Sequence, residues 1–161
     1  MRLVQPEFYL VYFLGLYGFG KNEELLNKAI GHRRSEYFLA SKCGLYRDAS
    51  GKREINGRPD VLKQTCDDSL RRLGTDCIDL YYLHRIDLNV PVEESLGALI
   101  DMKAQGKIRF IGLSEPSPET LNKALGMCSI AAVQSELSLW TRQPNVAVSK
   151  LCEQNDITFV S

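Results

Sequence analysis

Short apolar runs alternate with longer amphipathic segments along almost the whole chain. The runs are rich in aromatic and β-branched residues, and they cover residues 8–14, 37–41, 77–83, 108–113, 130–134 and 157–160. Such runs are typical of strands. Because they are continuously apolar rather than alternating, they predict parallel strands that are covered on both faces.

The segments between the runs carry apolar residues at helical spacing. Predicted helices cover residues 22–30, 59–73, 92–105 and 145–155, and a further helix begins after Ser117. Pro59 suits a first helical turn, Gly74 suits a C-terminal stop, and Ser117 suits an N-cap. The chain therefore consists of repeated β-α units with a last strand at the end, which predicts an α/β fold with a parallel sheet.

The longest predicted loop spans residues 43–58. It is polar, contains glycine and carries a net positive charge. A loop of this length is more often functional or mobile than inert.

Length and charge narrow the function classes. The chain has 161 residues, which predicts a single domain with a substantial core but falls short of the roughly 250 residues of a complete (β/α)8 barrel. The chain has 20 basic residues, counting Lys and Arg, and 20 acidic residues, counting Asp and Glu. This balance removes the electrostatic argument for nucleic acid or an anionic membrane as a partner.

The cysteine pattern and the apolar N-terminal stretch bear on the cellular compartment in which the protein is expected. The five cysteines are odd in number, widely spaced and without a C-x-x-C pair, so neither a disulfide framework nor a metal site is expected. A reducing cytoplasmic location is the simpler interpretation.

Residues 8–16 are apolar but too short for a membrane span, which takes about 20 residues. Pro6 and Glu7 and the lack of a small-residue cleavage site argue against a signal peptide.

Polar residues stand where the predicted strands end. Parallel α/β domains collect their chemistry at the carboxyl ends of the strands. In chain order these ends carry the residues Tyr17, Lys42, His84, Ser114, Glu115 and Gln134. Singly, each has a plain structural explanation, such as a solvated charge or a structural histidine, but together they occupy equivalent points of consecutive units. Tyrosine, lysine and histidine form a plausible proton-donor group, because a nearby cation lowers the pKa of a phenol.

A glycine-containing segment offers a remote alternative. Residues 15–21 fit the pattern G-x-x-x-x-G-K of a phosphate-binding loop. Asn22 follows, whereas such a loop requires Ser or Thr as a ligand of magnesium. A nucleotide-binding loop is therefore a near miss.

Several segments resemble the aldo-keto reductase family, in the branch of bacterial and fungal reductases and potassium-channel β subunits. The resemblance covers about residues 16–160 and rests on YGFGKNEELLNKAI, FLASKCG, LRRLGTDCIDLYYLHRID, GKIRFIGLSE and AAVQSELSLW. It implies an incomplete (β/α)8 TIM barrel with about six parallel strands, in a single partial domain over residues 1–161. Residues 1–14 are unlike the family, and the final barrel strand and the C-terminal loops are expected to be absent.

The resemblance also implies an activity. Family members transfer a hydride from NADPH to an aldehyde or ketone. In this sequence the implied catalytic residues are Tyr17 as proton donor, Lys42 beside it and His84 as the group that orients the carbonyl. The implied cofactor-binding residues are Ser114, Glu115 and Gln134, with Glu115 standing where many members have Asn.

Two departures from the family pattern leave a second interpretation open. Tyr12 stands where the family has an aspartate, and Leu137 stands where an aromatic residue stacks on the nicotinamide. A buried lysine without a carboxylate partner tends to lose its proton. For the chain by itself we therefore favour a non-catalytic remnant or interaction module of the same family. Open sheet edges predict self-association.

Overall fold

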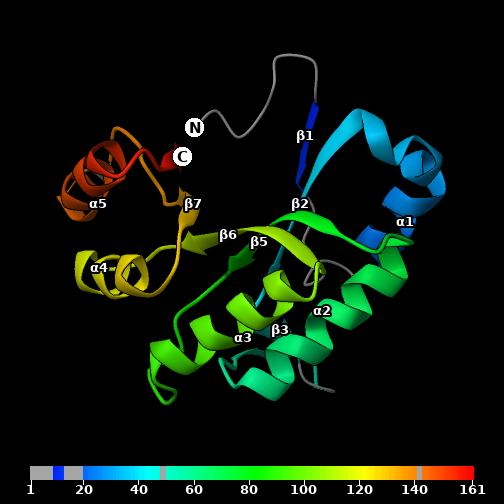
Figure 1. Cartoon of the computed structure of the whole chain (residues 1–161), viewed down its shortest axis with the longest axis horizontal. Coiled ribbons are helices and arrows are strands. Elements are labelled where there is room, and N and C mark those ends of the chain that lie inside the picture. Colours follow the sequence, from blue (N-terminus) through cyan, green and yellow to red (C-terminus); the bar gives the residue numbers. More distant parts are fainter. Residues whose placement is uncertain (1–8, 13–19, 48–49, 141–142) are drawn as a thin grey trace.

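The computed structural model describes residues 9–12, 20–47, 50–140 and 143–161. Within these residues one six-stranded sheet has the order β1-β2-β5-β6-β7-β8. Its strands are β1 (Tyr9–Tyr12), β2 (Tyr37–Cys43), β5 (Ile78–Leu83), β6 (Ile108–Ser114), β7 (Ile130–Gln134) and β8 (Thr158–Val160). All neighbouring strands are parallel. The sheet is curled with helices along its outer side (Figure 1), which confirms an incomplete (β/α)8 barrel.

Five α-helices connect the parallel strands of the described residues. They are α1 (Lys21–Ile30), α2 (Pro59–Leu73), α3 (Val92–Ala104), α4 (Pro118–Met127) and α5 (Gln143–Gln154). The predicted end signals are confirmed: Pro59 lies in the first turn of α2 and Gly74 ends it with a φ of 64°. The Ser117 hydroxyl caps α4 by accepting a hydrogen bond from the Thr120 N–H at 3.1 Å.

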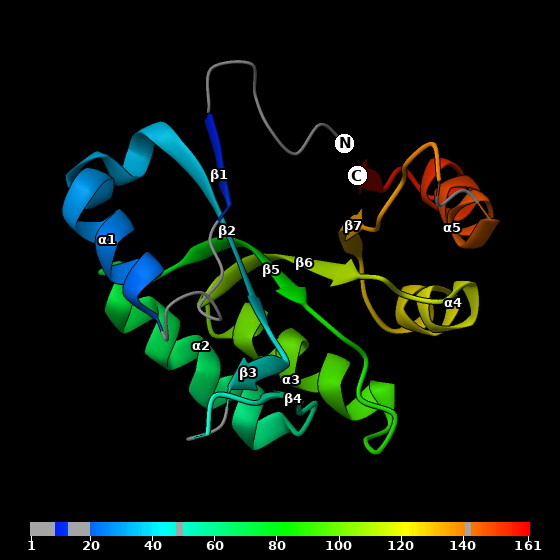
Figure 2. The same ribbon diagram turned by 180° about the vertical axis from the view of Figure 1, so that it is seen from behind.

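The predicted loop of residues 43–58 contains a short β-hairpin that the sequence did not predict. Its strands are β3 (Leu45–Arg47) and β4 (Arg53–Ile55), which pair antiparallel beside the end of β2 (Figure 2). The Tyr46 hydroxyl donates to the Glu54 carboxylate at 2.7 Å across the pair. The runs are too short and too polar to stand out as strands in the sequence.

Element ends also differ from the predictions by one or two residues. Strand β2 continues through Cys43 because Lys42 and Cys43 pair with Tyr82 and Leu83 of β5. A 3-10 helix, η1 (Gly31–Glu36), follows α1 and was not expected. None of the helices in the described ranges is both long and apolar enough to cross a membrane.

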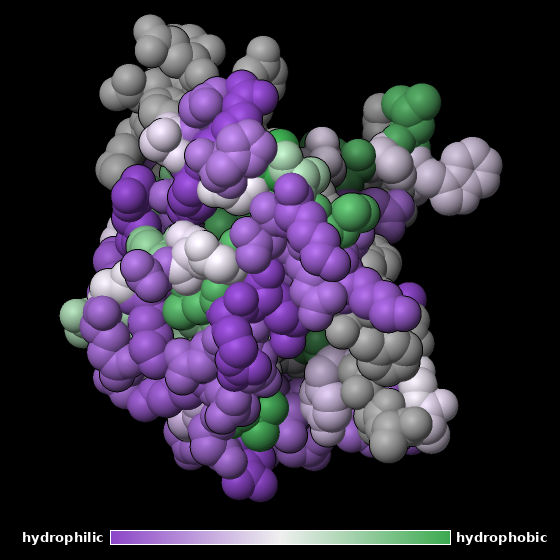
Figure 3. All heavy atoms as spheres, turned by 90° about the vertical axis from the view of Figure 1, so that its right-hand side faces the viewer, coloured by the Kyte–Doolittle hydropathy of each residue, from purple (hydrophilic) through white to green (hydrophobic). Residues whose placement is uncertain are grey.

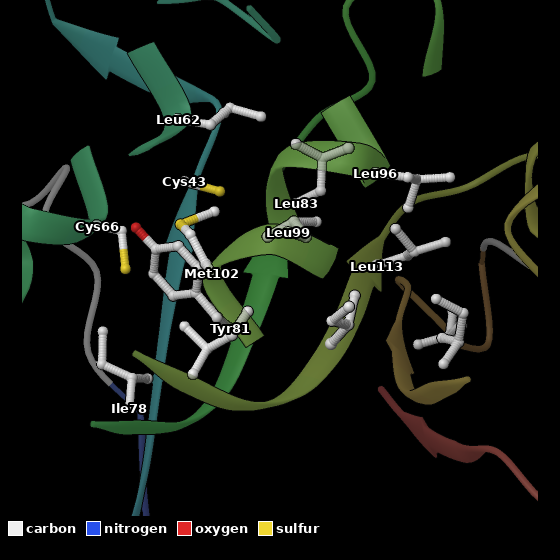
Figure 4. Close-up of a cluster of buried hydrophobic side chains, with 14 of the residues drawn as sticks. Cys43, Leu62, Cys66, Ile78, Tyr81, Leu83, Leu96, Leu99, Met102 and Leu113 are labelled. Atoms are coloured by element: carbon white, nitrogen blue, oxygen red, sulfur yellow. The ribbon is translucent and has the colours of Figure 1, made fainter. Parts of the chain in front are cut away.

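The two faces of the sheet carry separate apolar clusters. Successive side chains of a strand point to opposite faces, so odd and even positions sort into two sets. The larger cluster lies between the sheet and the helices, and the part of it that faces α2 and α3 (Figure 4) includes Cys43, Leu62, Cys66, Tyr81, Leu83, Leu99, Met102 and Leu113. The smaller cluster lies on the inner, concave face and consists of Phe38, Ala40, Leu80, Tyr82 and Ala132. The surface on the right-hand side of Figure 1 is mainly hydrophilic with scattered apolar side chains (Figure 3).

A buried ion pair joins α1 to α2 and β2. The Glu23 side chain is fully buried, and its carboxylate accepts a hydrogen bond from Arg72 Nε at 2.7 Å. It also accepts one from the Ser41 hydroxyl at 3.1 Å. A buried charge needs such partners, so Glu23 and Arg72 fix α1 against the outer face of the sheet.

A second buried carboxylate lies at the amino end of the sheet. Asp79 is 4% exposed and forms ion pairs with Arg34 at 2.7 Å and Arg109 at 3.0 Å. It also accepts a hydrogen bond from the Leu39 backbone N–H at 2.9 Å. It therefore connects η1, β2, β5 and β6.

Candidate active site

The strand ends bring four of the predicted site residues to the inner face of the sheet. Lys42 lies opposite Tyr82 in the register of β2 and β5, and Ser114 lies opposite Gln134 in the register of β6 and β7. His84 directly follows β5. These positions continue the same alternation as the inner apolar cluster, so they form its next layer toward the carboxyl ends.

Lys42 and Gln134 meet across the concave face. The Lys42 ammonium donates a hydrogen bond to Gln134 Oε1, although β5 and β6 separate their strands in the sheet. This contact is possible because the sheet curls. It brings the second and fifth strands of the sheet order to one site.

The environment of Lys42 disfavours its charged form. The side chain is half-buried, which disfavours the ammonium, although the ammonium also lies 5.6 Å from the centre of the Tyr82 ring in a cation–π contact that favours the charged form. Burial and the neighbouring Arg85 lower the pKa of Lys42 to about 8, while the more weakly acting Glu115 raises it. Among the described residues, no carboxylate forms an ion pair with Lys42.

His84 is held in its neutral form. Burial, followed by the positive charges of Lys42 and Arg85, lowers the pKa of its imidazole to about 4. Its backbone N–H donates to the Cys43 carbonyl at 2.8 Å, which ties the end of β5 to β2. Near pH 7 His84 therefore offers one N–H donor and one nitrogen acceptor.

Arg85 is a site residue that the sequence reasoning did not identify. Its guanidinium donates to the Ser114 hydroxyl at 3.5 Å and to the His84 carbonyl at 3.2 Å. It also lowers the pKa values of Lys42 and His84. The signal in the sequence was its position directly after His84 at a strand end.

Glu115 faces the segment that follows β7. Its φ of 52° is left-handed, and its carboxylate accepts hydrogen bonds from Ser135 Oγ at 3.2 Å and from the Glu136 N–H at 2.8 Å. Its own N–H donates to the Gln134 carbonyl at 2.8 Å. These bonds fix the backbone at the end of β7, where Gln134 stands.

Several predictions fall outside the described residues. Tyr17, the predicted proton donor, and most of the glycine segment 15–21 are among them. For Tyr12 the structure gives the backbone position only, opposite Ala40 in the register of β1 and β2. Leu137 is 48% exposed after β7. The roles assigned to these residues stay predictions.

The assembled groups suit a neutral polar ligand. The described part of the site offers a neutral imidazole, an amide, a hydroxyl and an amine with a lowered pKa. The described residues contain no group of three His, Cys, Asp or Glu side chains that could hold a metal ion. The arrangement can therefore hydrogen-bond a carbonyl or carboxamide oxygen through His84, Gln134 or Ser114.

Comparisons with known proteins identify the family. The Aldo/keto reductase family profile matches residues 11–161. An NADP(+) aldo-keto reductase of Schizosaccharomyces pombe, yakc, is 43% identical over 151 residues, covering 90% of this chain and 44% of that protein.

Solved structures agree with this match. Aldo-keto reductase AKR11C1 of Bacillus halodurans in its holo form superposes with a TM-score of 0.83 at 31% identity, covering 94% of this chain and 51% of that one. Glycerol dehydrogenase AKR11B4 of Gluconobacter oxydans superposes with a TM-score of 0.86 at 30% identity, covering 93% of this chain and 47% of that one. This chain thus spans about half the length of the relatives that it matches. It belongs to the aldo/keto reductase family.

Proposed function

We propose that this family member serves the NADPH-dependent reduction of an aldehyde or ketone. The observation that carries the proposal is the convergence of Lys42, His84, Ser114 and Gln134 on one concave layer. The NADP(+) in the name of the yeast relative supports the choice of cofactor. When bound, NADPH supplies the hydride that reduces the carbonyl carbon.

The residues present fit the carboxamide of a nicotinamide. Gln134 Oε1 accepts from Lys42, and its amide nitrogen makes no hydrogen bond to another described side chain. Ser114 offers a hydroxyl at the neighbouring register position. An amide nitrogen and a hydroxyl can donate to a carboxamide oxygen, so we assign cofactor contacts to Gln134 and Ser114. A carboxamide N–H would compete with Lys42 for Gln134 Oε1.

The substrate carbonyl would be polarised and protonated by this chain's own side chains. Neutral His84 can donate an N–H to the carbonyl oxygen, which stabilises the negative charge that develops there. We assign the proton donor to Tyr17, and the charged form of Lys42 would lower the pKa of its phenol. Because the pKa of Lys42 is about 8, that support weakens as the pH rises through this value.

Cofactor titration tests the proposal. We expect the purified chain to enhance nicotinamide fluorescence on addition of NADPH and to oxidise NADPH when an aldehyde is added. Gln134→Leu should weaken NADPH binding by about tenfold, the effect of losing one to two hydrogen bonds. Lys63→Arg, a surface replacement on α2, is the matched control. Absence of binding at millimolar cofactor would overturn the proposal for this chain.

The second candidate is a non-catalytic family member. It is favoured because Lys42 forms no ion pair with a carboxylate among the described residues and donates to the neutral amide of Gln134 instead. It predicts that Tyr12→Asp alone restores little reductase activity. A large gain of activity in that variant would contradict it.

We also propose self-association through the outer strands of the sheet. Within the described residues, β1 and β8 stand at the two ends of the strand order. Their open edges can hydrogen-bond a second chain. Light scattering should then show oligomers, and a sharp monomer peak would refute this.

A further inference from the structure

We propose that Lys42 is a nucleophilic amine that condenses with small aldehydes to form an imine at this site, without any cofactor. A carbonyl compound would thus be bound covalently and reversibly by the chain itself. The proposal goes beyond carbonyl reduction because it needs neither hydride transfer nor Tyr17.

The described groups in direct contact with the Lys42 amine carry no negative charge. Its hydrogen-bond acceptor is the neutral amide oxygen of Gln134, and the ring of Tyr82 lies 5.6 Å away. The described charged or titratable groups around it are Arg85 and His84 after β5 and Glu115 after β6. Glu115 directs its carboxylate to Ser135 Oγ and the Glu136 N–H instead.

Such surroundings activate a lysine. An amine in an apolar site beside another cation gives up its proton more readily, and the free amine is the form that attacks carbonyl carbons. The Lys42 side chain is also only half-buried, so a small aldehyde can reach it. The inner layer below it, with Tyr82 and Ala40, is apolar and suits an aliphatic group.

The amount of free amine follows from its pKa of about 8. At pH 7 about 10% of such an amine is unprotonated, against about 0.04% for an ordinary exposed lysine, a ratio of about 200. A less basic amine is also a weaker nucleophile. At pH 7 we therefore expect Lys42 to form the imine about tenfold faster than an exposed lysine does.

The condensation is balanced without a redox partner. The nitrogen lone pair attacks the carbonyl carbon, and the electron pair of the C=O bond moves to oxygen, which takes a proton. The carbinolamine then loses this oxygen as water while the C=N bond forms and the nitrogen releases its proton. Water reverses the reaction.

Reductive trapping tests this directly. The chain is incubated at pH 7 with propanal and cyanoborohydride, with no NADPH present, and the secondary amines formed are located by peptide mass spectrometry. We expect Lys42 to be labelled about tenfold faster than the exposed Lys28 and Lys150 of the same sample. Equal or slower labelling of Lys42 would overturn the proposal.

Variants and a pH series give independent readouts. Lys42→Arg should remove the fast phase of labelling, whereas the surface control Lys63→Arg should retain it. Glu115→Gln removes the carboxylate that favours the charged form, so it should speed the labelling of Lys42. In the unaltered chain the labelling rate of Lys42 should reach half its maximum near pH 8. A rate that still rises in step with the exposed lysines above pH 9 would refute the inference, whatever the reductase assay shows.

Discussion

Replacing Lys42 by methionine should stabilise the fold at neutral pH. Burial and Arg85 lower the pKa of the Lys42 amine from its ordinary 10.5 to about 8. One unit is about 1.4 kcal/mol, so the charged form destabilises the folded chain by about 3 kcal/mol at most. Because the side chain is half-buried, solvent screening reduces this to about 2 kcal/mol. Methionine has a similar length and no charge, so it should relieve this penalty.

Loss of the hydrogen bond to Gln134 works in the opposite direction. Losing this bond lowers the free energy of unfolding by about 1 kcal/mol, so Lys42→Met should give a net stabilisation of about 1 kcal/mol at pH 7. The pH dependence has a definite sign. The unfolded chain keeps the lysine proton up to pH 10.5 and the folded chain releases it near pH 8. The unaltered protein therefore gains stability between these values, and the advantage of the variant should vanish by about pH 10.

Urea unfolding followed by circular dichroism measures this difference. Fluorescence is the poorer probe, because Trp140 is already 96% exposed in the folded chain. The matched control is Lys63→Met, since Lys63 pairs with Asp101 on the surface and its loss should change stability by less than about 1 kcal/mol. If Lys42→Met lowers stability at pH 7, or if its effect is the same at pH 7 and pH 10, the reasoning is refuted.

Three further changes test the packing, each by urea unfolding. Arg72→Met should cost about 3–5 kcal/mol, because it leaves the carboxylate of Glu23 buried without its cation; a loss below 1 kcal/mol would contradict a structural role for this pair. Gly112→Ala should cost about 1–3 kcal/mol, since a Cβ there would lie 2.5 Å from the Tyr82 ring; full stability would show that the inner layer has spare room. Tyr81→Phe should leave stability unchanged or raise it by up to about 1 kcal/mol, because the buried Tyr81 hydroxyl has no hydrogen-bond partner among the described residues; a marked loss would show that this hydroxyl is satisfied in solution.

The sequence predicted the elements well where periodicity was strong. Continuous apolar runs identified the parallel strands, and Pro59, Gly74 and Ser117 marked helix ends that the structure confirms. The hairpin of β3 and β4 was missed because each strand has three residues and a polar composition. Such short pairing depends on contacts across the hairpin rather than on any pattern along the chain.

The candidate site was predictable as a set of positions and not as a set of contacts. Strand ends placed Lys42 and Gln134 at one edge of the sheet, but their hydrogen bond depends on how strongly the sheet curls. The influence of Arg85 on Lys42 and His84 was equally hidden, because it acts through space between neighbouring strand ends. Charge interactions of this kind need three-dimensional distances.

The Asp79 carboxylate has a consequence for the opposite end of the sheet. By accepting the Leu39 N–H while it pairs with Arg34 and Arg109, it fixes how β2 is aligned with β5 before their ladder begins. A slip of β2 by one residue would turn its inner positions outward and carry Lys42 into the helix-facing core. The anchor at the amino end thus decides which side chains are presented at the carboxyl end. A mutation of Asp79 would therefore move Lys42 away from Gln134 without altering any residue at the carboxyl end.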